Sequence, residues 1–368
     1  MKNPETIKTP TIILNEKRAK TNIALMAGKA GSQGVRFRPH FKTHQSAAIG
    51  NWFREHGIKS ITVSSVKMAF YFAENGWEDI LIAFPVNIRE LDSLRMLSSR
   101  INLGLLVDNL QAAERLIKSA IHADVWIKID TGMGRAGIPW EDRPAQVELA
   151  RIAAGGGHLR FRGLLTHAGQ TYHAHSRQEI ISLYNESVNR INACRKELEQ
   201  AIKIKIEVSV GDTPGCWLAE NLGNVNEIRP GNFIFFDAMM HQLGVCKTEE
   251  IALCVACPVI SKYEERQEIL ILGGAVHLSK EVIEHSEPEN YGFAVPSPDS
   301  AEWNISNNNF IRSLSQEHGI IKLDEMLFGQ VEVGDLIYIV PVHSCLVVSA
   351  LGEYLMISGE RLEAQISV

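Results

Sequence analysis

The sequence predicts a (β/α)8 barrel followed by an all-β domain. Two observations predict the barrel: eight short apolar segments are typical of strands, and helical stretches separate them as in parallel βαβ units. A third observation, the scarcity of helical patterns after residue 236, predicts the second domain. An open doubly wound sheet shares the alternation, but eight units in sequence favour a closed barrel. We expect the barrel at 15–240 and the β domain at 241–368, and we expect the N-terminal segment 1–14 to be part of the β domain.

The elements follow in chain order. An apolar run at 11–14 precedes Asn15, which is expected to cap a helix over 16–30. The barrel strands are expected at 35–41, 60–64, 79–83, 102–107, 123–129, 160–166, 205–210 and 225–228, with helices such as 65–75, 87–98 and 178–201 between them. The strands of the second domain are expected at 251–261, 268–272, 319–323, 336–342 and 354–358.

Composition excludes several classes of protein. With 45% hydrophobic and 22% charged residues, the 368-residue chain has the balance of a soluble globular protein. The net charge of -6 argues against nucleic-acid binding, and no apolar run reaches the about 20 residues of a membrane helix. The N-terminus lacks the apolar core of a signal peptide. Six cysteines are too few for a disulfide scaffold, so we expect a cytoplasmic protein.

The first expected barrel strand carries basic residues at alternating positions. Side chains alternate along a strand, so five basic residues share one side: Arg36, Arg38, His40, Lys42 and His44. If the apolar side meets the helices, this basic side faces into the barrel, where cations are costly unless an anion neutralises them. Neighbouring cations also favour the neutral, nucleophilic form of an amine. We interpret Lys42 as a reactive lysine; a solvated lysine on an exposed strand is the alternative.

A glycine-rich loop follows the fifth strand. Gly132, Gly134 and Gly137 match the G-x-G-x-x-G pattern of dinucleotide-binding turns, which normally belong to a first βα unit. Arg135 within the loop is suited to contact an anion or a ring. The loop is therefore either functional or a plain strand-to-helix turn, and a nicotinamide-dependent dehydrogenase is kept as a remote alternative.

Two more turns and one histidine motif lie where barrel enzymes place their sites. The turn after the seventh strand contains Ser209, Gly211 and Thr213, and the turn after the eighth contains Arg229, Gly231 and Asn232. Barrel enzymes frequently bind phosphate in these two loops, so we expect a phosphate site there. The sixth strand ends at His167, with Tyr172 shortly after it, and that position favours a role in the site. His173 and His175 are expected to face solvent.

A histidine and a cysteine stand together near the C-terminus. His343 and Cys345 are expected on a strand, where the i, i+2 spacing puts both on one face. Imidazole and thiolate form a soft pair suited to zinc, although a core histidine and cysteine would explain them as well. Cys254 and Cys257 have metal-like spacing, but no second pair follows, and we interpret them as unrelated core residues.

A reactive lysine, a phosphate site at the barrel mouth and a basic interior together suggest pyridoxal 5′-phosphate. On the same residues the sequence resembles the D-serine dehydratase and D-threonine aldolase family, metal-activated pyridoxal enzymes of fold type III with an alanine-racemase-like barrel. The resemblance spans nearly the whole chain. The motifs that carry it are 38–44, 130–137, 167–172, 211–214, 229–231 and the final His343-x-Cys345.

The resemblance implies roles for the residues already singled out. Lys42 would hold the cofactor as a Schiff base, and an arginine at the pyridine nitrogen would leave that nitrogen unprotonated, so that bound metal supplies the missing activation. Asp212 stands where a second glycine is common, and Gln170 where a histidine is expected. The implied cofactor-binding residues are His40, Lys42, Arg135, Tyr172, Ser209, Gly211, Thr213, Arg229, Gly231 and Asn232, and the implied ligands of Zn²⁺ or another divalent metal are His343 and Cys345.

The implied activity is that of a lyase acting on D-3-hydroxyamino acids. The preferred reaction is a D-serine dehydratase type elimination to a 2-oxo acid and ammonia, with Lys42 taking the Cα proton. In this family, as the resemblance indicates, dehydratases carry His-x-Cys and aldolases His-x-Asp, which favours elimination. One alternative is a D-threonine aldolase-type cleavage to glycine and an aldehyde, with His167 as the base. A non-catalytic pyridoxal phosphate carrier is a second, but a carrier has no need of a metal pair.

The partners expected are small. A D-amino acid is the substrate, and neither nucleic acid nor membrane is expected as a partner. The resemblance implies a homodimer.

Overall fold

The computed structural model describes residues 4–284, 286–298, 303 and 305–365. The chain divides into two compact units. The barrel unit comprises residues 25–42 and 53–231, and the β unit comprises residues 1–24, 43–52 and 232–368. The sequence placed the boundary at 240, whereas this division ends the barrel unit at 231 and takes residues 15–24 and 43–52 into the β unit. None of the described helices is long and apolar enough to span a membrane.

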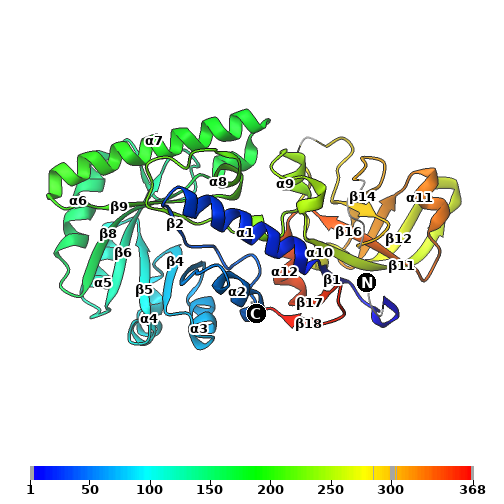
Figure 1. Ribbon diagram of the computed structural model, residues 1–368, viewed down its shortest axis with the longest axis horizontal. Coiled ribbons are helices and arrows are strands. Elements are labelled where there is room, and N and C mark those ends of the chain that lie inside the picture. The colour runs from blue at the N-terminus through cyan, green and yellow to red at the C-terminus, as the bar shows by residue number, and fades with distance from the viewer. Residues whose placement is uncertain (1–3, 285, 299–302, 304, 366–368) are drawn as a thin grey trace. The chain divides into compact units, whose positions relative to one another are not determined.

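Eight parallel strands form the barrel, in the order β2-β10-β9-β8-β6-β5-β4-β3 (Figure 1). Each of the eight strands expected from the sequence is present, which confirms the barrel. Their bounds are β2 (Arg36–Phe37), β3 (Ser60–Val63), β4 (Asp79–Pro85), β5 (Asn102–Val107), β6 (Ala123–Asp130), β8 (Leu159–His167), β9 (Glu207–Gly211) and β10 (Glu227–Ile228), and a short β7 (Ile138–Pro139) pairs with β6.

The barrel closes between β2 and β3. Strand β2 is short, but the chain runs on beside β3, where His40 and Thr62 form a parallel bridge. The Phe41 N–H donates to the Thr62 carbonyl at 2.8 Å, and the Thr62 N–H donates to the Pro39 carbonyl at 2.9 Å. The chain then turns at residues 41–44, so the strand alternation predicted through His44 stops before that residue.

Helices cover the outside of the barrel strands (Figure 1). Six of them begin at a polar cap whose side chain accepts a hydrogen bond from a first-turn N–H: Asn15, Ser65, Asn109, Asp142, Ser176 and Asp212. The helices up to residue 231 are α1 (Glu16–Ser32), α2 (Ala47–Arg54), α3 (Val66–Glu74), α4 (Leu91–Ser98), α5 (Leu110–Ile117), α6 (Arg143–Gly155), α7 (Arg177–Ile202) and α8 (Thr213–Leu218). The apolar side of the first strand meets them as predicted, since the Phe41 ring packs against Phe53 and Phe72 at centroid distances of 5.0 Å.

The barrel interior has an apolar side and a charged side. Strands β4, β5, β6 and β8 contribute the buried cluster Leu81, Leu106, Trp126 and Leu165. Burial of such side chains stabilises the fold by about 1.5–3 kcal/mol each. Strands β2, β9 and β10 bring ionic side chains into the interior instead, and these form the base of the candidate site.

The β unit contains one sheet in the order β12-β15-β14-β13-β16-β11-β1-β17-β18, and β12 also pairs with β11. Neighbours are antiparallel except β1 and β17, which are parallel. The strands are β1 (Thr11–Leu14), β11 (Leu253–Tyr263), β12 (Glu268–Leu272), β13 (Gly292–Val295), β14 (Phe310–Leu314), β15 (His318–Lys322), β16 (Leu336–Pro341), β17 (Glu353–Met356) and β18 (Arg361–Glu363). The helices are α9 (Ala238–Gln242), α10 (Ala275–Leu278), α11 (Glu325–Gln330) and α12 (Ser344–Leu351).

The all-β character of this unit is confirmed, with one local error. His343 and Cys345 were expected on a strand, but β16 ends at Pro341. His343 is the N-cap of α12, and Cys345 lies in the first turn of that helix. The apolar run before His343 suggested a longer strand than the chain forms.

Candidate active site

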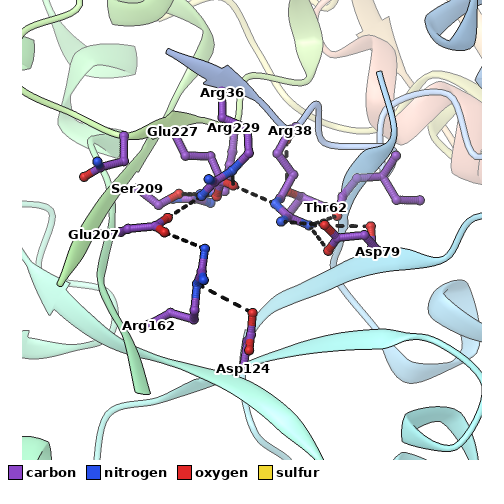
Figure 2. A network of polar contacts seen from close by, with 12 residues as sticks. Arg36, Arg38, Thr62, Asp79, Asp124, Arg162, Glu207, Ser209, Glu227 and Arg229 are labelled. Atoms are coloured by element: carbon purple, nitrogen blue, oxygen red, sulfur yellow. Dashed lines mark hydrogen bonds and ion pairs between the residues drawn. The ribbon is translucent and has the colours of Figure 1, made fainter. Parts of the chain in front are cut away.

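The base of the site is an ionic network inside the barrel (Figure 2). The Glu227 carboxylate accepts hydrogen bonds from Arg36 Nε at 2.6 Å and Arg38 Nε at 2.7 Å. Arg38 also donates to Asp79 at 2.7 Å, and Arg36 donates to Glu207 at 2.5 Å. The basic side of the first strand therefore does face inward at Arg36 and Arg38, but carboxylates of the protein neutralise it, so these two cations leave no charge for a ligand.

Glu227 is fixed as a carboxylate. It is fully buried, and burial alone would raise its pKa, but the two guanidinium groups outweigh burial and lower that pKa to about 2. Its other oxygen accepts a hydrogen bond from Ser209 Oγ at 2.7 Å. The charge of Glu227 thereby orients the Ser209 hydroxyl.

Arg229 continues this chain of contacts. Its Nε donates to Ser209 Oγ at 2.7 Å, and its Nη2 donates to the Thr166 carbonyl at 2.5 Å. The guanidinium packs flat on Gly211, where a Cβ would lie 3.0 Å from Nη1. Burial lowers the pKa of Arg229 to about 10, so the group stays cationic at neutral pH. Nη1 makes no hydrogen bond to the described residues, so its N–H donors are available to a ligand.

Lys42 lies on the turn that follows the first strand. Its side chain is exposed, and within the described residues its amine makes neither a hydrogen bond nor an ion pair. The Lys42 N–H donates to His40 Nδ1 over 3.4 Å. Burial and the cations Lys42 and Arg229 lower the pKa of His40 well below its usual range, so its imidazole is neutral. His44, predicted to share this side, lies instead in the β unit, where it is buried.

His167 ends β8 as a neutral base. Its Nδ1 lies 2.6 Å from the Gly211 carbonyl, which can only accept, so Nδ1 carries the proton and Nε2 the lone pair. Burial and the charges of Lys128, Arg135 and Lys42 lower the pKa of His167 well below its usual range. The Tyr172 ring lies 6.1 Å away, centroid to centroid.

Thr213 offers a buried hydroxyl with no partner. Its side chain is fully buried at the start of α8, and Oγ1 has no hydrogen-bond partner in the described part of the chain. The Thr213 N–H donates to the Tyr172 hydroxyl at 3.1 Å. An unpaired buried hydroxyl is destabilising, so this one is suited to a ligand.

Asp212 is accounted for by helix capping. Its carboxylate accepts hydrogen bonds from the Gly215 N–H at 2.5 Å and from Thr171 Oγ1 at 3.0 Å. Burial raises the pKa of Asp212 to about 6. Gln170, the other departure from the family pattern, donates to Ser187 Oγ at 2.7 Å.

The glycine-rich loop folds around Asp130. The carboxylate of Asp130 accepts backbone hydrogen bonds from Gly132, Met133 and Gly134, each at 2.9 Å. This cage presents Arg135 as an exposed side chain without a hydrogen bond or ion pair in the described structure.

The last cofactor-binding candidates follow β10. Gly231 ends the barrel unit, and Asn232 begins the next segment of the β unit. The Asn232 amide donates to Asp237 at 2.6 Å and Ser344 Oγ at 3.2 Å. Its side-chain donors are therefore engaged, whereas its side-chain carbonyl oxygen is buried with no hydrogen-bond partner in the described structure.

His343 and Cys345, hereafter the metal pair, are brought together at the start of α12. The His343 ring contacts the Cys345 side chain, and its Nδ1 lies 2.8 Å from a Glu281 carboxylate oxygen. Burial lowers the pKa of His343, but Cys345 and Glu281 outweigh burial and raise that pKa to about 11. Asp237 accepts the Ser344 N–H at 3.0 Å and so fixes the residue between the two. Cys345 Sγ also lies 3.3 Å from the hydroxyl of Thr43.

Two family descriptions match the chain. Residues 14–239 match the alanine racemase, N-terminal domain, and residues 252–357 match a putative serine dehydratase domain. The chain belongs to the alanine racemase N-terminal domain family. This membership confirms the family resemblance predicted from the lysine motif.

Several relatives of this chain are named as lyases. The D-threo-3-hydroxyaspartate dehydratase of Delftia sp. strain HT23 is 29% identical over 351 residues, which cover 92% of this chain and 91% of the relative. The D-serine dehydratase of Dictyostelium discoideum is 28% identical, covering 96% and 94%. The 3-hydroxy-D-aspartate aldolase of Paracoccus denitrificans is 25% identical, covering 92% and 85%. Dehydratases and aldolases both occur among the relatives.

Solved structures confirm the fold. The Delftia enzyme matches with a TM-score of 0.88 at 28% identity, covering 99% of both chains. A mutant of that enzyme with alanine in place of a cysteine, solved in a metal-free form, matches with a TM-score of 0.90 at 27% identity, covering 99% of both chains. The predicted alanine-racemase-like barrel with a C-terminal β domain is thus confirmed.

Pyridoxal phosphate fits the barrel residues of this family member. The unpartnered Lys42 amine, the orphan Thr213 hydroxyl and the unused Nη1 of Arg229 are groups that such a cofactor would satisfy. We call Lys42, His167, Tyr172, Thr213 and Arg229 the cofactor centre. Ser209 differs from its expected role as a phosphate ligand, because its hydroxyl is already held between Glu227 and Arg229.

A soft divalent metal fits the metal pair. Imidazole nitrogen and thiolate sulfur suit zinc, and because Glu281 holds Nδ1, Nε2 would be the coordinating nitrogen. Among the described residues, no three His, Cys, Asp or Glu side chains form a metal-binding group. Two protein ligands leave positions for water and substrate, as a catalytic metal requires.

Sequence reasoning missed the supporting residues. Glu281 and Asp237 lie far from the metal pair in sequence, and no local pattern marks them. Thr43 follows Lys42, and nothing in the lysine motif marks it as a separate functional residue. Lys128 carried a signal that could have found it, since it is the one charged side chain inside the apolar run 125–129.

Proposed function

We propose that this protein is a pyridoxal phosphate- and metal-dependent lyase that removes water from D-3-hydroxyamino acids, with a 2-oxo acid and ammonia as products. The observation that carries the choice of elimination is the soft His343 and Cys345 pair, which suits a metal acting as Lewis acid on a hydroxyl leaving group. The printed activities of the Delftia and Dictyostelium relatives support the proposal.

Lys42 is the central residue of the proposal. Its exposed amine is available to hold the cofactor and, once the substrate amine displaces it, to take the Cα proton. When bound, pyridoxal phosphate supplies the electron sink that makes this proton acidic. The Cβ–O bond then breaks, hydroxide leaves with the electron pair, and the released enamine is hydrolysed by water.

Other members of the cofactor centre orient the reactants. Arg229 would donate from Nη1 to the pyridine nitrogen, because Ser209 and the Thr166 carbonyl already hold Nε and Nη2. We prefer Arg229 to the exposed Arg135 for this contact. Thr213 would donate its hydroxyl to the phosphate, and Gly211 and Gly231 would let the backbone approach that group.

His343 and Cys345 would hold the divalent metal, with zinc as the proposed ion. There it would polarise the substrate hydroxyl as a leaving group. Removal of the metal with a chelator should abolish turnover while the visible spectrum of the cofactor persists. Added zinc should restore the activity, and full activity in metal-free His343→Ala would contradict this assignment.

A D-threonine aldolase-type cleavage is the second candidate. The observation that favours it is the neutral His167, whose Nε2 lone pair could take the proton of a β-hydroxyl. The aldolase of Paracoccus denitrificans among the relatives supports it as well.

Product analysis separates the two reactions. The holoenzyme is incubated separately with D-serine, D-threonine and D-threo-3-hydroxyaspartate. Elimination yields ammonia with pyruvate, 2-oxobutanoate or oxaloacetate, whereas cleavage of the latter two yields glycine and an aldehyde. Glycine release from D-threonine without any 2-oxo acid would contradict the dehydratase proposal.

We further propose a cytoplasmic homodimer. All six cysteines lie in the described part of the chain, and none forms a disulfide there, which supports a reducing compartment. The family resemblance supports the dimer, and the mass of the purified protein in solution tests it.

A further inference from the structure

Lys128 is a buried lysine on the barrel strand β6. Its side chain is 7% exposed, and it shares a strand face with Trp126, which belongs to the interior cluster. Lys128 lies two residues further toward the carboxyl end of the strand, which is the end where barrels place their active sites. It pairs in register with Leu165, two residues before His167. The strand therefore directs Lys128 into the barrel mouth.

No group of the protein neutralises this amine. In the described structure Lys128 has neither a hydrogen bond nor an ion pair from its side chain. The two acidic residues within electrostatic range are occupied otherwise: Asp130 accepts backbone N–H groups of its own loop, and Asp108 accepts from Asn109 at 2.9 Å. Burial together with Arg229 and Arg135 lowers the pKa of Lys128 to about 7. An anion bound at Lys128 would offset both effects that disfavour the charged amine, its burial and the repulsion from the two arginines.

The glycine-rich loop is built around the stem of Lys128. Gly137 has a φ of +112°, and a Cβ there would lie 2.8 Å from Lys128 Cγ. A larger residue would push the lysine from its place. The loop thus packs against the stem of Lys128.

The balance of charge indicates what the anion is. Arg36 and Arg38 are matched by carboxylates, and Lys42 is committed to the cofactor in the proposed function. Arg229 is hydrogen-bonded only to neutral groups and is assigned to the cofactor in the proposed function. Two further cations act on this part of the barrel without a hydrogen bond or ion pair in the described structure, the exposed Arg135 and the buried Lys128. An amino acid with one carboxylate would satisfy one of them. A dicarboxylic amino acid would satisfy both.

We propose that Lys128 binds the second carboxylate of a 3-hydroxy dicarboxylic D-amino acid, and so selects substrates of the hydroxyaspartate class over D-serine. The inference rests on the proposed function, because it specifies the side chain accepted at that site. The contact is a charge-assisted hydrogen bond from an ammonium to a carboxylate. Lys128 is a specificity-determining residue here and takes no part in bond cleavage.

The test compares two substrates in one set of variants. Wild-type holoenzyme, Lys128→Met and Lys128→Arg are assayed with D-threo-3-hydroxyaspartate and D-serine. Lys128→Met should lower the ratio of kcat/KM for hydroxyaspartate over D-serine by about 10–100-fold, as expected for loss of one charged hydrogen bond. Lys128→Arg should keep most of the preference. Succinate, as a competitive inhibitor of D-serine turnover, should lose about tenfold or more of its affinity in Lys128→Met.

Other outcomes would overturn the inference. An equal loss of kcat/KM with both substrates in Lys128→Met would show that Lys128 binds the α-carboxylate. Loss of the visible cofactor band would show that it binds the cofactor. An unchanged ratio of kcat/KM for the two substrates would show that Lys128 does not bind the second carboxylate. If the wild type forms no 2-oxo acid from either substrate, the proposed function fails, and calorimetric binding of succinate to wild type and Lys128→Met still tests the anion site. Lys128→Gln replaces the methionine variant if that variant does not fold.

Discussion

The cofactor centre and the metal pair are supported in different ways. Beneath the cofactor centre lies an ionic network whose members come from β2, β4, β9 and β10, with Glu227 at its middle (Figure 2). The metal pair stands on the first turn of one helix, with single contacts from Glu281 and Asp237. The first is a buried network of hydrogen-bonded ionic groups from several strands. The second is a local site that two carboxylates contact.

This difference has a consequence for mutation. A change in the network should alter fold stability as well as cofactor placement, because breaking a buried ion pair leaves an uncompensated charge. A change in the supports of the metal pair should alter metal affinity with little effect on folding.

Replacement of Lys42 should have the largest effect, and it should change activity without changing fold stability. Lys42→Ala should lower turnover by about four orders of magnitude, because both the covalent hold on the cofactor and the proton acceptor are lost. The free energy of unfolding should change by no more than about 0.5 kcal/mol, since the side chain is exposed. Steady-state kinetics and denaturant unfolding measure the two. Lys59→Ala, another exposed lysine, is the control and should leave both quantities unchanged.

Removing the charge of Glu227 tests the network itself. Glu227→Gln should lower the free energy of unfolding by about 3–5 kcal/mol, because Arg36 and Arg38 lose their shared carboxylate. Glu207→Gln is the matched control: this carboxylate is half-buried, and its loss should cost about 1 kcal/mol or less. Equal losses in the two variants would contradict a central role for Glu227.

The contribution of the Glu227 charge should also appear in the pH dependence of the free energy of unfolding. The pKa of Glu227 is lowered from 4.5 to about 2 in the folded protein, so its contribution is fully present above about pH 4.5 and is lost as the pH falls toward 2. The difference between wild type and Glu227→Gln should therefore shrink over that window in urea unfolding. A difference that stays constant down to pH 2.5 would show that the carboxylate is not responsible.

Much of the barrel could be predicted from the sequence, because each strand is an apolar run bounded by turn residues. The β unit was harder to predict. Strands β13, β14 and β18 were missed because they are short and stand beside proline, asparagine or charged residues. Strand β13 also pairs with β16, more than 40 residues later in the sequence. The lysine motif indicated Lys42, but the pairing of Arg36 and Arg38 with Glu227 joins residues about 190 positions apart, as the sequence separations of 191 and 189 show.

A change beside the metal pair should have a smaller effect, and that effect should be confined to metal affinity. Glu281→Gln should weaken zinc binding by about 10–100-fold, because the carboxylate that fixes the His343 tautomer is lost. Folding should change little, so the contrast with Glu227→Gln is direct. Titration calorimetry with zinc measures the affinity. The supporting role is excluded if Glu281→Gln and wild type bind zinc equally well.

Thr213→Val should have the smallest and most selective effect. Cofactor affinity should fall by about tenfold through the loss of one hydrogen bond to the phosphate. The cofactor-free protein should gain about 1 kcal/mol of stability, because the variant removes a buried hydroxyl that has no partner in the described structure. Spectroscopic titration with pyridoxal phosphate and thermal unfolding without it measure the two effects, and a destabilised cofactor-free variant would contradict this reading of the hydroxyl.

The most direct test of the whole account is to locate the cofactor on the chain. The purified holoenzyme is reduced with borohydride, digested, and the pyridoxyl-labelled peptide is identified by mass spectrometry. The account predicts that the label lies on Lys42 and is retained in Lys128→Met. A label on Lys128, or on any other lysine, would contradict the assignment of Lys42 as the residue that holds the cofactor.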